Sequence, residues 1–408
     1  MCIFLHSRHM KKTVYSSLAL IMMAVWTGGG AAVYPEIVID SDSGVILYQV
    51  HANQSWYPAS LTKMMTLYLT FSALKSKKLA LNGKLKASAH AAMQPATHLG
   101  LRKNESISVN DAISAVATIS ANDVAVVLAE QLAGSEQAFA RQMNIQARSL
   151  GMNSTVFRNA SGLPDSLQTT TARDMAILGF RLKQDFPEYF HYFSKPAFTY
   201  RGRTRNSSNR LLGSYKGTNG IKTGFTCASG YNLVASVQRR GIGLIGVVLG
   251  SSSNANRNRR MVHLLDTGFS KAQRGKYGLN IVDLTSGNSD WQAAPVRLGP
   301  GQCGRYSGKS ILTGGKLPGW GILLGTYSNR KEALSIAKKA RSSLKGVSRN
   351  GRTAILQRKF KHGSSWKVLL VGMRQKDVGK ACKHLWAQGM ICLTQSPQVM
   401  ARQGFARL

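Results

Sequence analysis

The alternation of apolar and polar positions predicts β-strands in two regions of the chain. Apolar runs at 36–40 and 45–48 flank Asp42-Ser43-Gly44, a pattern typical of a β-hairpin. Three later apolar runs are separated by short turns and predict an antiparallel sheet, whose edge the hairpin completes. These runs span 220–226, 232–237 and 244–249.

Helical spacing of apolar residues occurs between and after these strand regions. It predicts helices over 59–75, 112–118, 123–133, 139–150 and 263–269. We expect Val109-Asn110-Asp111 to cap the second of these, Gly134 to stop the third, and the last to pack on the sheet. Another helix is expected to begin after Thr171, whose side chain suits an N-cap.

The pattern changes after residue 270. Residues 271–318 are rich in Gly, Ser, Pro and basic residues and lack periodicity, which predicts a linker. Residues 319–394 follow a βαββαβ pattern, which predicts a four-stranded sheet with both helices on one face. Its strands are expected at 320–327, 353–360, 366–373 and 390–393, and its helices at 331–344 and 377–388.

Residues 1–32 resemble a secretory signal peptide, with basic residues, a short apolar run at 18–26 and small residues at 28–32. An uncleaved N-terminal anchor is the alternative. We therefore expect an exported protein with a first folded domain at 33–270, a linker at 271–318, a second domain at 319–394 and a tail at 395–408.

The amino-acid composition, and above all the net charge, limits the classes of molecule that the protein is expected to bind. The 408 residues are 43% hydrophobic, and the net charge is +37. Residues 301–408 contribute 21 Lys and Arg against 2 Asp and Glu. Such a surface favours anionic partners, but no nucleic-acid-binding signature accompanies it. We therefore expect an anionic polymer or a membrane surface and no nucleic acid.

The cysteines have no metal-site spacing, and we predict neither a metal nor another cofactor. Cys2 belongs to the expected leader. Cys382 and Cys392 are candidates to pair within the second domain, but the sequence leaves open the pairing of the later cysteines, Cys227, Cys303, Cys382 and Cys392.

The first candidate chemistry lies at the start of the 59–75 helix. Ser60 and Lys63 are one turn apart, so their hydroxyl and amine share a face. A buried lysine is driven toward its neutral form and can then activate the serine as a nucleophile. The motif alone is weak, since the same spacing recurs at Ser72-Lys75, Ser335-Lys338 and Ser342-Lys345.

Two further elements follow in order: Ser120-x-Asn122 and Lys222-Thr223-Gly224. Together with Ser60-x-x-Lys63 they match the serine acyl-transferase set of penicillin-binding proteins and class A β-lactamases. The match extends over roughly residues 34–270, including the flanking sequences 57–66, 120–123, 159–165, 171–176 and 219–226. This region resembles the low-molecular-mass penicillin-binding proteins, the D-alanyl-D-alanine carboxypeptidases of serine peptidase family S11. Ala121, where many relatives have glycine, is a departure at a variable position.

The resemblance implies a β-lactamase/transpeptidase-like α+β (mixed α/β) fold, with an antiparallel sheet and a helical subdomain. It implies that Ser60 is the nucleophile, Lys63 its base and Ser120 a proton relay. Asn122, Lys222, Thr223, Gly224 and Phe225 would bind substrate, with the Ser60 and Phe225 amides forming an oxyanion hole. Peptidoglycan stem peptides are the implied substrates, β-lactams the covalent inhibitors and the periplasm the location.

The expected module at 319–394 resembles a SPOR domain, on its βαββαβ pattern and on residues 320–328. This resemblance implies binding to peptidoglycan glycan strands. The usual C-terminal β-rich domain of the carboxypeptidases is not evident in the sequence.

Three alternatives remain beside the carboxypeptidase. A class A β-lactamase would need a Glu-x-x-x-Asn loop between the second and third elements, and neither Glu136 nor Glu188 supplies one. A DD-endopeptidase that cuts crosslinks is chemically close, and the sequence does not distinguish it. A largely non-catalytic wall-binding protein is the third, and the complete motif set argues against it.

Overall fold

The computed structural model describes residues 34–95, 97–165, 167–275, 278–281, 319–327, 329–344, 346, 351–360, 363–388, 390 and 392–395. The expected signal peptide, most of the linker and all of the tail after Gln395 lie outside these residues. No helix among them is long and apolar enough to cross a membrane.

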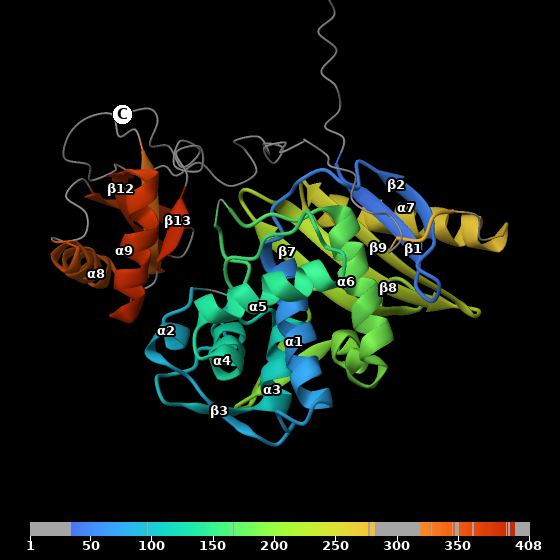
Figure 1. The fold of residues 1–408 in the computed structure, drawn as a ribbon, viewed down its shortest axis with the longest axis horizontal. Coiled ribbons are helices and arrows are strands. Elements are labelled where there is room, and N and C mark those ends of the chain that lie inside the picture. Colours follow the sequence, from blue (N-terminus) through green and yellow to red (C-terminus); the bar gives the residue numbers. More distant parts are fainter. Residues whose placement is uncertain are drawn as a thin grey trace, which may run out of the picture. The chain divides into compact units, whose positions relative to one another are not determined.

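A five-stranded antiparallel sheet forms the centre of the first folded region (Figure 1). Its order is β2-β1-β9-β8-β7, so the N-terminal hairpin completes one edge as predicted, and β7 forms the other. The strands are β1 (Glu36–Asp40), β2 (Ile46–Val50), β7 (Thr218–Thr226), β8 (Gly230–Arg239) and β9 (Ile242–Ser251).

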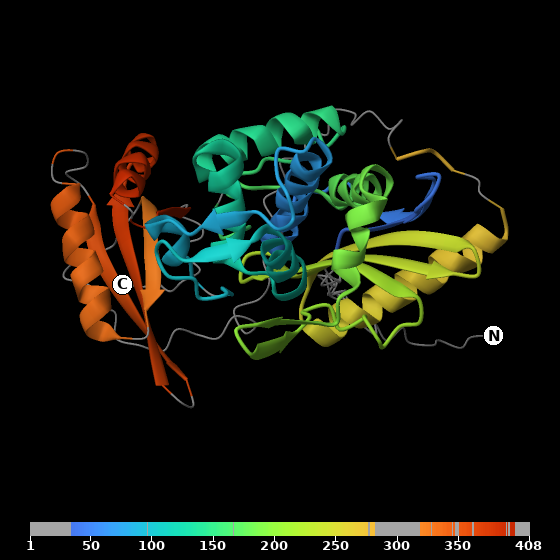
Figure 2. The same cartoon turned by 90° about the horizontal axis from the view of Figure 1, so that it is seen from below.

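Both faces of this sheet are buried. Helix α7 (Asn254–Gln273) packs on one face and α6 (Ala172–Asp185) on the other, as Figure 2 shows. Glycines permit this close packing. A Cβ at Gly246 of β9 would lie 2.7 Å from the Met261 sulfur of α7, and one at Gly179 of α6 would lie 3.2 Å from Ile245.

A helical region lies on the α6 side of the sheet and shares its hydrophobic core. Its central helix α1 (Lys63–Lys75) follows the 3-10 turn η1 (Ala59–Thr62). The other elements are β3 (Lys84–Lys86), α2 (Ala89–Ala92), β4 (Ser106–Ser108), α3 (Val109–Ser114), η2 (Ala115–Ile119), α4 (Asn122–Ala133) and α5 (Glu136–Ser149). After α6 come η3 (Pro187–Ser194) and a hairpin of β5 (Ala197–Tyr200) and β6 (Arg203–Asn206).

Several predicted boundaries were wrong, most of them by a few residues. Ser108, not the 109–111 stretch, caps α3 by accepting from the Asp111 amide. Helix α5 begins three residues before the predicted start, because Ser135 caps it. Helix α7 is far longer than 263–269. Thr171 caps α6 and Gly134 ends α4, as predicted.

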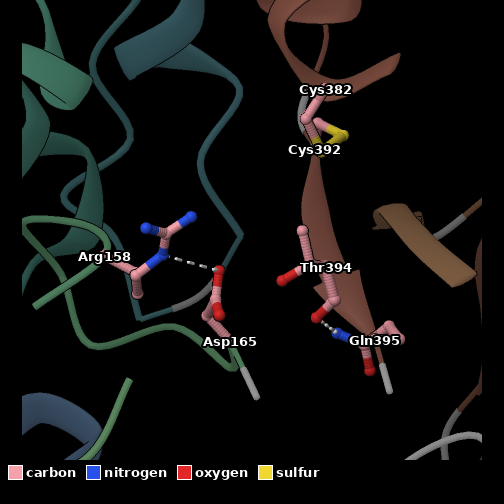
Figure 3. Close-up of a disulfide and its surroundings, with 6 residues drawn as sticks. All are labelled: Arg158, Asp165, Cys382, Cys392, Thr394 and Gln395. Carbon is pink, nitrogen blue, oxygen red and sulfur yellow. Dashed lines mark hydrogen bonds and ion pairs between the residues drawn. A yellow bond between two sulfur atoms is a disulfide. The ribbon is translucent and has the colours of Figure 1, made fainter. Parts of the chain in front are cut away.

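The C-terminal region has the predicted βαββαβ order: β10 (Trp320–Tyr327), α8 (Arg330–Ser343), β11 (Arg352–Phe360), β12 (Gly363–Met373), α9 (Gln375–Ala387) and β13 (Leu393–Gln395). The last strand starts three residues later than predicted. The four strands form one sheet, and both helices contribute to one buried cluster with it. A disulfide joins Cys382 of α9 to Cys392, the pair that the sequence offered as a candidate and left open (Figure 3).

Candidate functional site

Ser60 and Lys63 lie where η1 passes into α1. Lys63 is fully buried, and its Nζ donates to Ser60 Oγ at 3.1 Å and to Asn122 Oδ1 at 2.7 Å. Burial lowers the pKa of Lys63 well below its usual range, and the nearby charge of Lys222 lowers it further. The carboxylates of Asp123 and Glu136 act in the opposite direction. The first and second sequence elements therefore meet at one amine.

Lys63 has a third partner that the sequence analysis missed, a backbone carbonyl. Its Nζ donates to the oxygen of Ser161 at 2.5 Å. The 159–162 segment around this carbonyl is tied to α1, because Thr66 Oγ1 donates to the Ala160 oxygen at 2.7 Å. Asn159 Oδ1 accepts from the Gly162 amide at 2.7 Å. A sequence motif cannot reveal a backbone acceptor, because any residue type supplies a carbonyl. The segment does, however, belong to the flanking sequence 159–165 that carries the family resemblance.

Ser120 occupies a special backbone position. The helix α3 continues into the π-helical η2, which ends at Ser120 in the left-handed region, with φ 62° and ψ 37°. The Ser120 hydroxyl is buried and has no hydrogen-bond partner within the described residues. The hydroxyl is therefore available for a further hydrogen bond, two residues before Asn122, whose side chain contacts Lys63.

Asn122 and Asp123 fix the loop that precedes them. Asn122 uses its Oδ1 for Lys63 and donates its Nδ2 to the Pro95 carbonyl at 2.9 Å. The Asp123 carboxylate accepts from three successive amides of the 99–101 loop, at 2.8 to 3.1 Å. Asp123 was not among the predicted site residues, and its position directly after Ser120-x-Asn122 was the available signal.

The third element runs along the edge strand β7. Lys222 is buried and donates to the Thr223 carbonyl at 3.0 Å, while Thr223 Oγ1 donates to Ser208 Oγ at 2.7 Å. A Cβ on Gly224 would lie 3.1 Å from the Ser60 amide nitrogen, so this glycine brings β7 against the η1 turn. Phe225 is 43% exposed.

Asn232 of β8 joins the sheet to the turn that carries Ser60. It is opposite Gly224 in the sheet and fully buried. Its Nδ2 donates to the carbonyls of Tyr57 and Pro58 at 3.0 and 3.3 Å, and its Oδ1 accepts from the Gly250 amide at 2.9 Å. Asn232 lies outside the three sequence motifs and was not predicted as a site residue.

A second buried cation affects Lys222. Burial and the positive charge of Arg257 on α7 lower the pKa of Lys222 to about 7. Arg257 is itself buried, and burial lowers its own pKa to about 10. The β7 edge therefore concentrates positive charge, which favours a negatively charged ligand group.

No group of His, Cys, Asp or Glu residues in the described part of the chain has an arrangement that could hold a metal ion. Among the eight residues predicted from sequence, hydrogen bonds at the Lys63 amine join Ser60, Lys63 and Asn122, and Lys222 acts on Lys63 through its charge. Gly224 lies against the Ser60 amide. The other three are Ser120, at the end of η2, and Thr223 and Phe225, on β7.

The region that contains these residues is similar to known proteins. A family model described as Peptidase_S11, D-alanyl-D-alanine carboxypeptidase, matches residues 31–253. The chain is 37% identical over 240 residues to D-alanyl-D-alanine carboxypeptidase DacC of Escherichia coli (strain K12), covering 57% of this chain and 60% of that protein. It spans 60% to 62% of the length of the curated carboxypeptidases that it matches over 240 to 246 residues.

Solved structures with a similar fold include penicillin binding protein 5 of Haemophilus influenzae, with a TM-score of 0.57 and 35% identity. That match covers 58% of this chain and 70% of the other. Penicillin-Binding Protein D2 of Listeria monocytogenes, in its ampicillin-bound form, has a TM-score of 0.54 and 33% identity. That match covers 58% of this chain and 97% of the Listeria protein.

Proposed function

This chain belongs to the peptidase S11 family, the D-alanyl-D-alanine carboxypeptidases, and we propose on that premise that it removes the terminal D-alanine from peptidoglycan stem peptides. The reaction proceeds through an acyl-serine intermediate at Ser60. The observation that carries the proposal is the 3.1 Å contact of Ser60 Oγ with the Nζ of a fully buried lysine.

Acylation begins with a neutral Lys63. As Ser60 Oγ attacks the carbonyl of the penultimate D-alanine, Lys63 Nζ takes the hydroxyl proton. The oxyanion that forms is stabilised by the Ser60 and Phe225 amides, and such a donor typically contributes about 3 kcal/mol. The depressed pKa of Lys63 supports this role.

Collapse of the tetrahedral intermediate breaks the D-Ala–D-Ala amide bond, and the leaving amine receives the proton. We assign this delivery to Ser120, whose buried hydroxyl is unpartnered within the described residues and available for a relay. Water then attacks the acyl-serine and releases the shortened peptide. Lys63 takes a proton from that water and returns it to Ser60 Oγ as the ester bond breaks.

Substrate recognition falls to the β7 edge. The terminal carboxylate is held by the Lys222 ammonium and the Thr223 hydroxyl. Gly224 lets the substrate backbone approach the strand, and Asn122 binds the peptide amide of the acyl part. The positive charge concentrated at Lys222 and Arg257 supports the choice of an anionic terminus. β-Lactams, which carry a carboxylate next to a reactive amide, should acylate the same serine.

We extend the proposal to the whole chain as a periplasmic, wall-associated enzyme. Residues 33–270 form the catalytic domain, and 319–394 form a SPOR-like module that binds glycan strands. The βαββαβ order of the C-terminal strands and helices supports the second assignment. Its Lys and Arg content suits an anionic envelope surface.

Release of D-alanine from a short peptide ending in D-Ala–D-Ala tests the activity. We expect Ser60→Ala to abolish release. Ser72→Ala is a matched control, because Ser72 and Lys75 have the same spacing on the same helix and both are exposed. Loss of activity in Ser72→Ala alone, or full activity in Ser60→Ala, would contradict the assignment. Parallel assay of a crosslinked dimer separates carboxypeptidase from endopeptidase activity.

A further inference from the structure

A carboxylate outside the three sequence elements reaches the back of the Lys63 site. Glu136 is the first residue of α5, and its side chain is 14% exposed. Its Oε1 accepts from the Ala160 amide at 3.0 Å. It thus adds a second side-chain hydrogen bond to Ala160 of the 159–162 segment, beside the one from Thr66 of α1.

That segment is also the one that contacts Lys63. The Ala160 carbonyl accepts from Thr66, and the next carbonyl, of Ser161, accepts from Lys63 Nζ. Ala160 is therefore held at its amide by Glu136 and at its carbonyl by Thr66 of α1. A shift of this residue would move the adjoining Ser161 oxygen relative to the lysine amine.

Glu136 is in turn oriented by a histidine. Its Oε2 lies 2.8 Å from Nε2 of His90 on α2, whose side chain is 16% exposed. The other ring nitrogen, Nδ1, is buried and unpartnered within the described residues. His90 also faces Glu130 of α4. Burial lowers the pKa of His90, but the hydrogen bond to Glu136 and its charge outweigh burial, and the net pKa is raised.

We propose that Glu136, oriented by His90, is a positioning residue for Lys63: it fixes the Ser161 carbonyl against the amine and sets the local charge. The inference rests on the proposed function, in which Lys63 is the base. The charged groups that face Lys63 are Lys222 of β7, Asp123 of α4 and Glu136 of α5.

The effect of the Glu136 charge on the pKa of Lys63 has a defined direction. The negative charge of Glu136 raises the pKa of Lys63, against the lowering by burial and Lys222. Protonated His90 offsets part of that charge. Loss of the Glu136 charge should therefore make Lys63 neutral at lower pH, and loss of the His90 charge should do the reverse.

The test measures the rate of acylation by benzylpenicillin as a function of pH in the full chain. Glu136→Gln keeps an acceptor for the Ala160 amide and removes the charge. We expect the pH at which acylation is half-maximal to fall by about 0.5–1.5 units. Glu136→Ala removes the acceptor as well, and we expect the maximal rate to fall about 10- to 100-fold.

Two other variants complete the design. His90→Gln keeps a donor for Glu136 and should move the midpoint to higher pH. Glu130→Gln is the matched control, because Glu130 faces His90 but is not among the charges that act on Lys63. It should leave the midpoint unchanged.

An unchanged midpoint in Glu136→Gln together with a wild-type maximal rate in Glu136→Ala would overturn the inference, even if both variants melt at lower temperature. A midpoint shift in Glu130→Gln equal to that of Glu136→Gln would also overturn it. If the wild-type protein is not acylated at all, the proposed function fails and this inference fails with it. Acylated wild type with unchanged Glu136 variants contradicts the inference alone.

Discussion

A Cβ on Gly162 would stand 1.8 Å from the carbonyl oxygen of Ala59, the residue before Ser60. Gly162 is in the left-handed region, with φ +79°, and Ala59 has a positive φ of 49°. The 159–162 segment and the η1 turn are therefore pressed together as backbone against backbone. This contact lies next to the two groups that meet the Lys63 amine, the Ser161 carbonyl and the Ser60 hydroxyl.

Gly162→Ala should accordingly disrupt the site. The new methyl group must displace Ala59 or the 159–162 segment, and we expect the acylation rate with benzylpenicillin to fall about 100-fold or more. Gly134→Ala is the control, because Gly134 has a similar φ of +73° but open space around its Cβ position. The control should cost about 1–2 kcal/mol of stability and keep its acylation rate. Wild-type acylation of Gly162→Ala would show that the contact is unimportant.

Carboxylate recognition should weaken as pH rises through about 7. The Lys222 pKa is lowered to about 7, so its charge is present below that pH and lost above it. We expect the preference for a peptide with a free C-terminal carboxylate, over the same peptide as a C-terminal amide, to decline through this range. The measurement is kcat/KM for both peptides against pH. A ratio that does not change with pH would exclude Lys222 as the charge that binds the carboxylate.

Arg257 should determine the pH at which the preference for a free C-terminal carboxylate declines. Removing its positive charge in Arg257→Gln relieves one cause of the lowered Lys222 pKa, so the decline should move to higher pH by about 0.5–1 unit. Arg259→Gln, an exposed arginine on the same helix, should leave the decline in place. Equal shifts in both variants would point to a general surface-charge effect instead.

Asn232→Ala should destabilise the protein and slow acylation together. The substitution leaves the Tyr57 carbonyl and the Gly250 amide without this partner. Buried groups left unsatisfied typically cost about 1–3 kcal/mol. Denaturant unfolding would measure the loss of stability, and acylation kinetics would measure the effect on the Ser60 turn. Stability at the wild-type value would contradict the proposed tether.

The disulfide should matter to the C-terminal region alone. Cys382→Ser with Cys392→Ser removes a link between residues 10 apart in sequence, and we expect a loss of about 2–3 kcal/mol in that region. The double variant should be acylated by benzylpenicillin at the wild-type rate. A slower rate would show that the catalytic domain and the C-terminal module are not independent.

Much of the fold was predictable from local pattern. The five strands of the main sheet and the βαββαβ order of the C-terminal region follow from alternation and turn residues. The start of α5 was missed because its first turn is polar and precedes the apolar run, although Ser135 followed by Glu136 is a recognisable cap. The β5–β6 hairpin was missed because its outer strand is polar and exposed.

Only the part of the site that consists of side-chain groups was predictable from sequence. Ser60, Lys63 and Lys222 were found because motif spacing reports side-chain chemistry. The Ser161 carbonyl and the Gly162 contact were missed because they involve backbone atoms that meet across about a hundred positions of sequence. Glu136 and Arg257 act through charge at a distance, and their effect appears only when the fold brings them near the two lysines.

The most direct test of the central claim is the intact mass of the protein with and without benzylpenicillin, followed by peptide mapping. We predict a stoichiometric mass gain that maps to Ser60, is released slowly and is absent in Ser60→Ala. No adduct on folded protein, or an adduct that maps to another residue, would contradict the assignment of Ser60 as the acylated nucleophile.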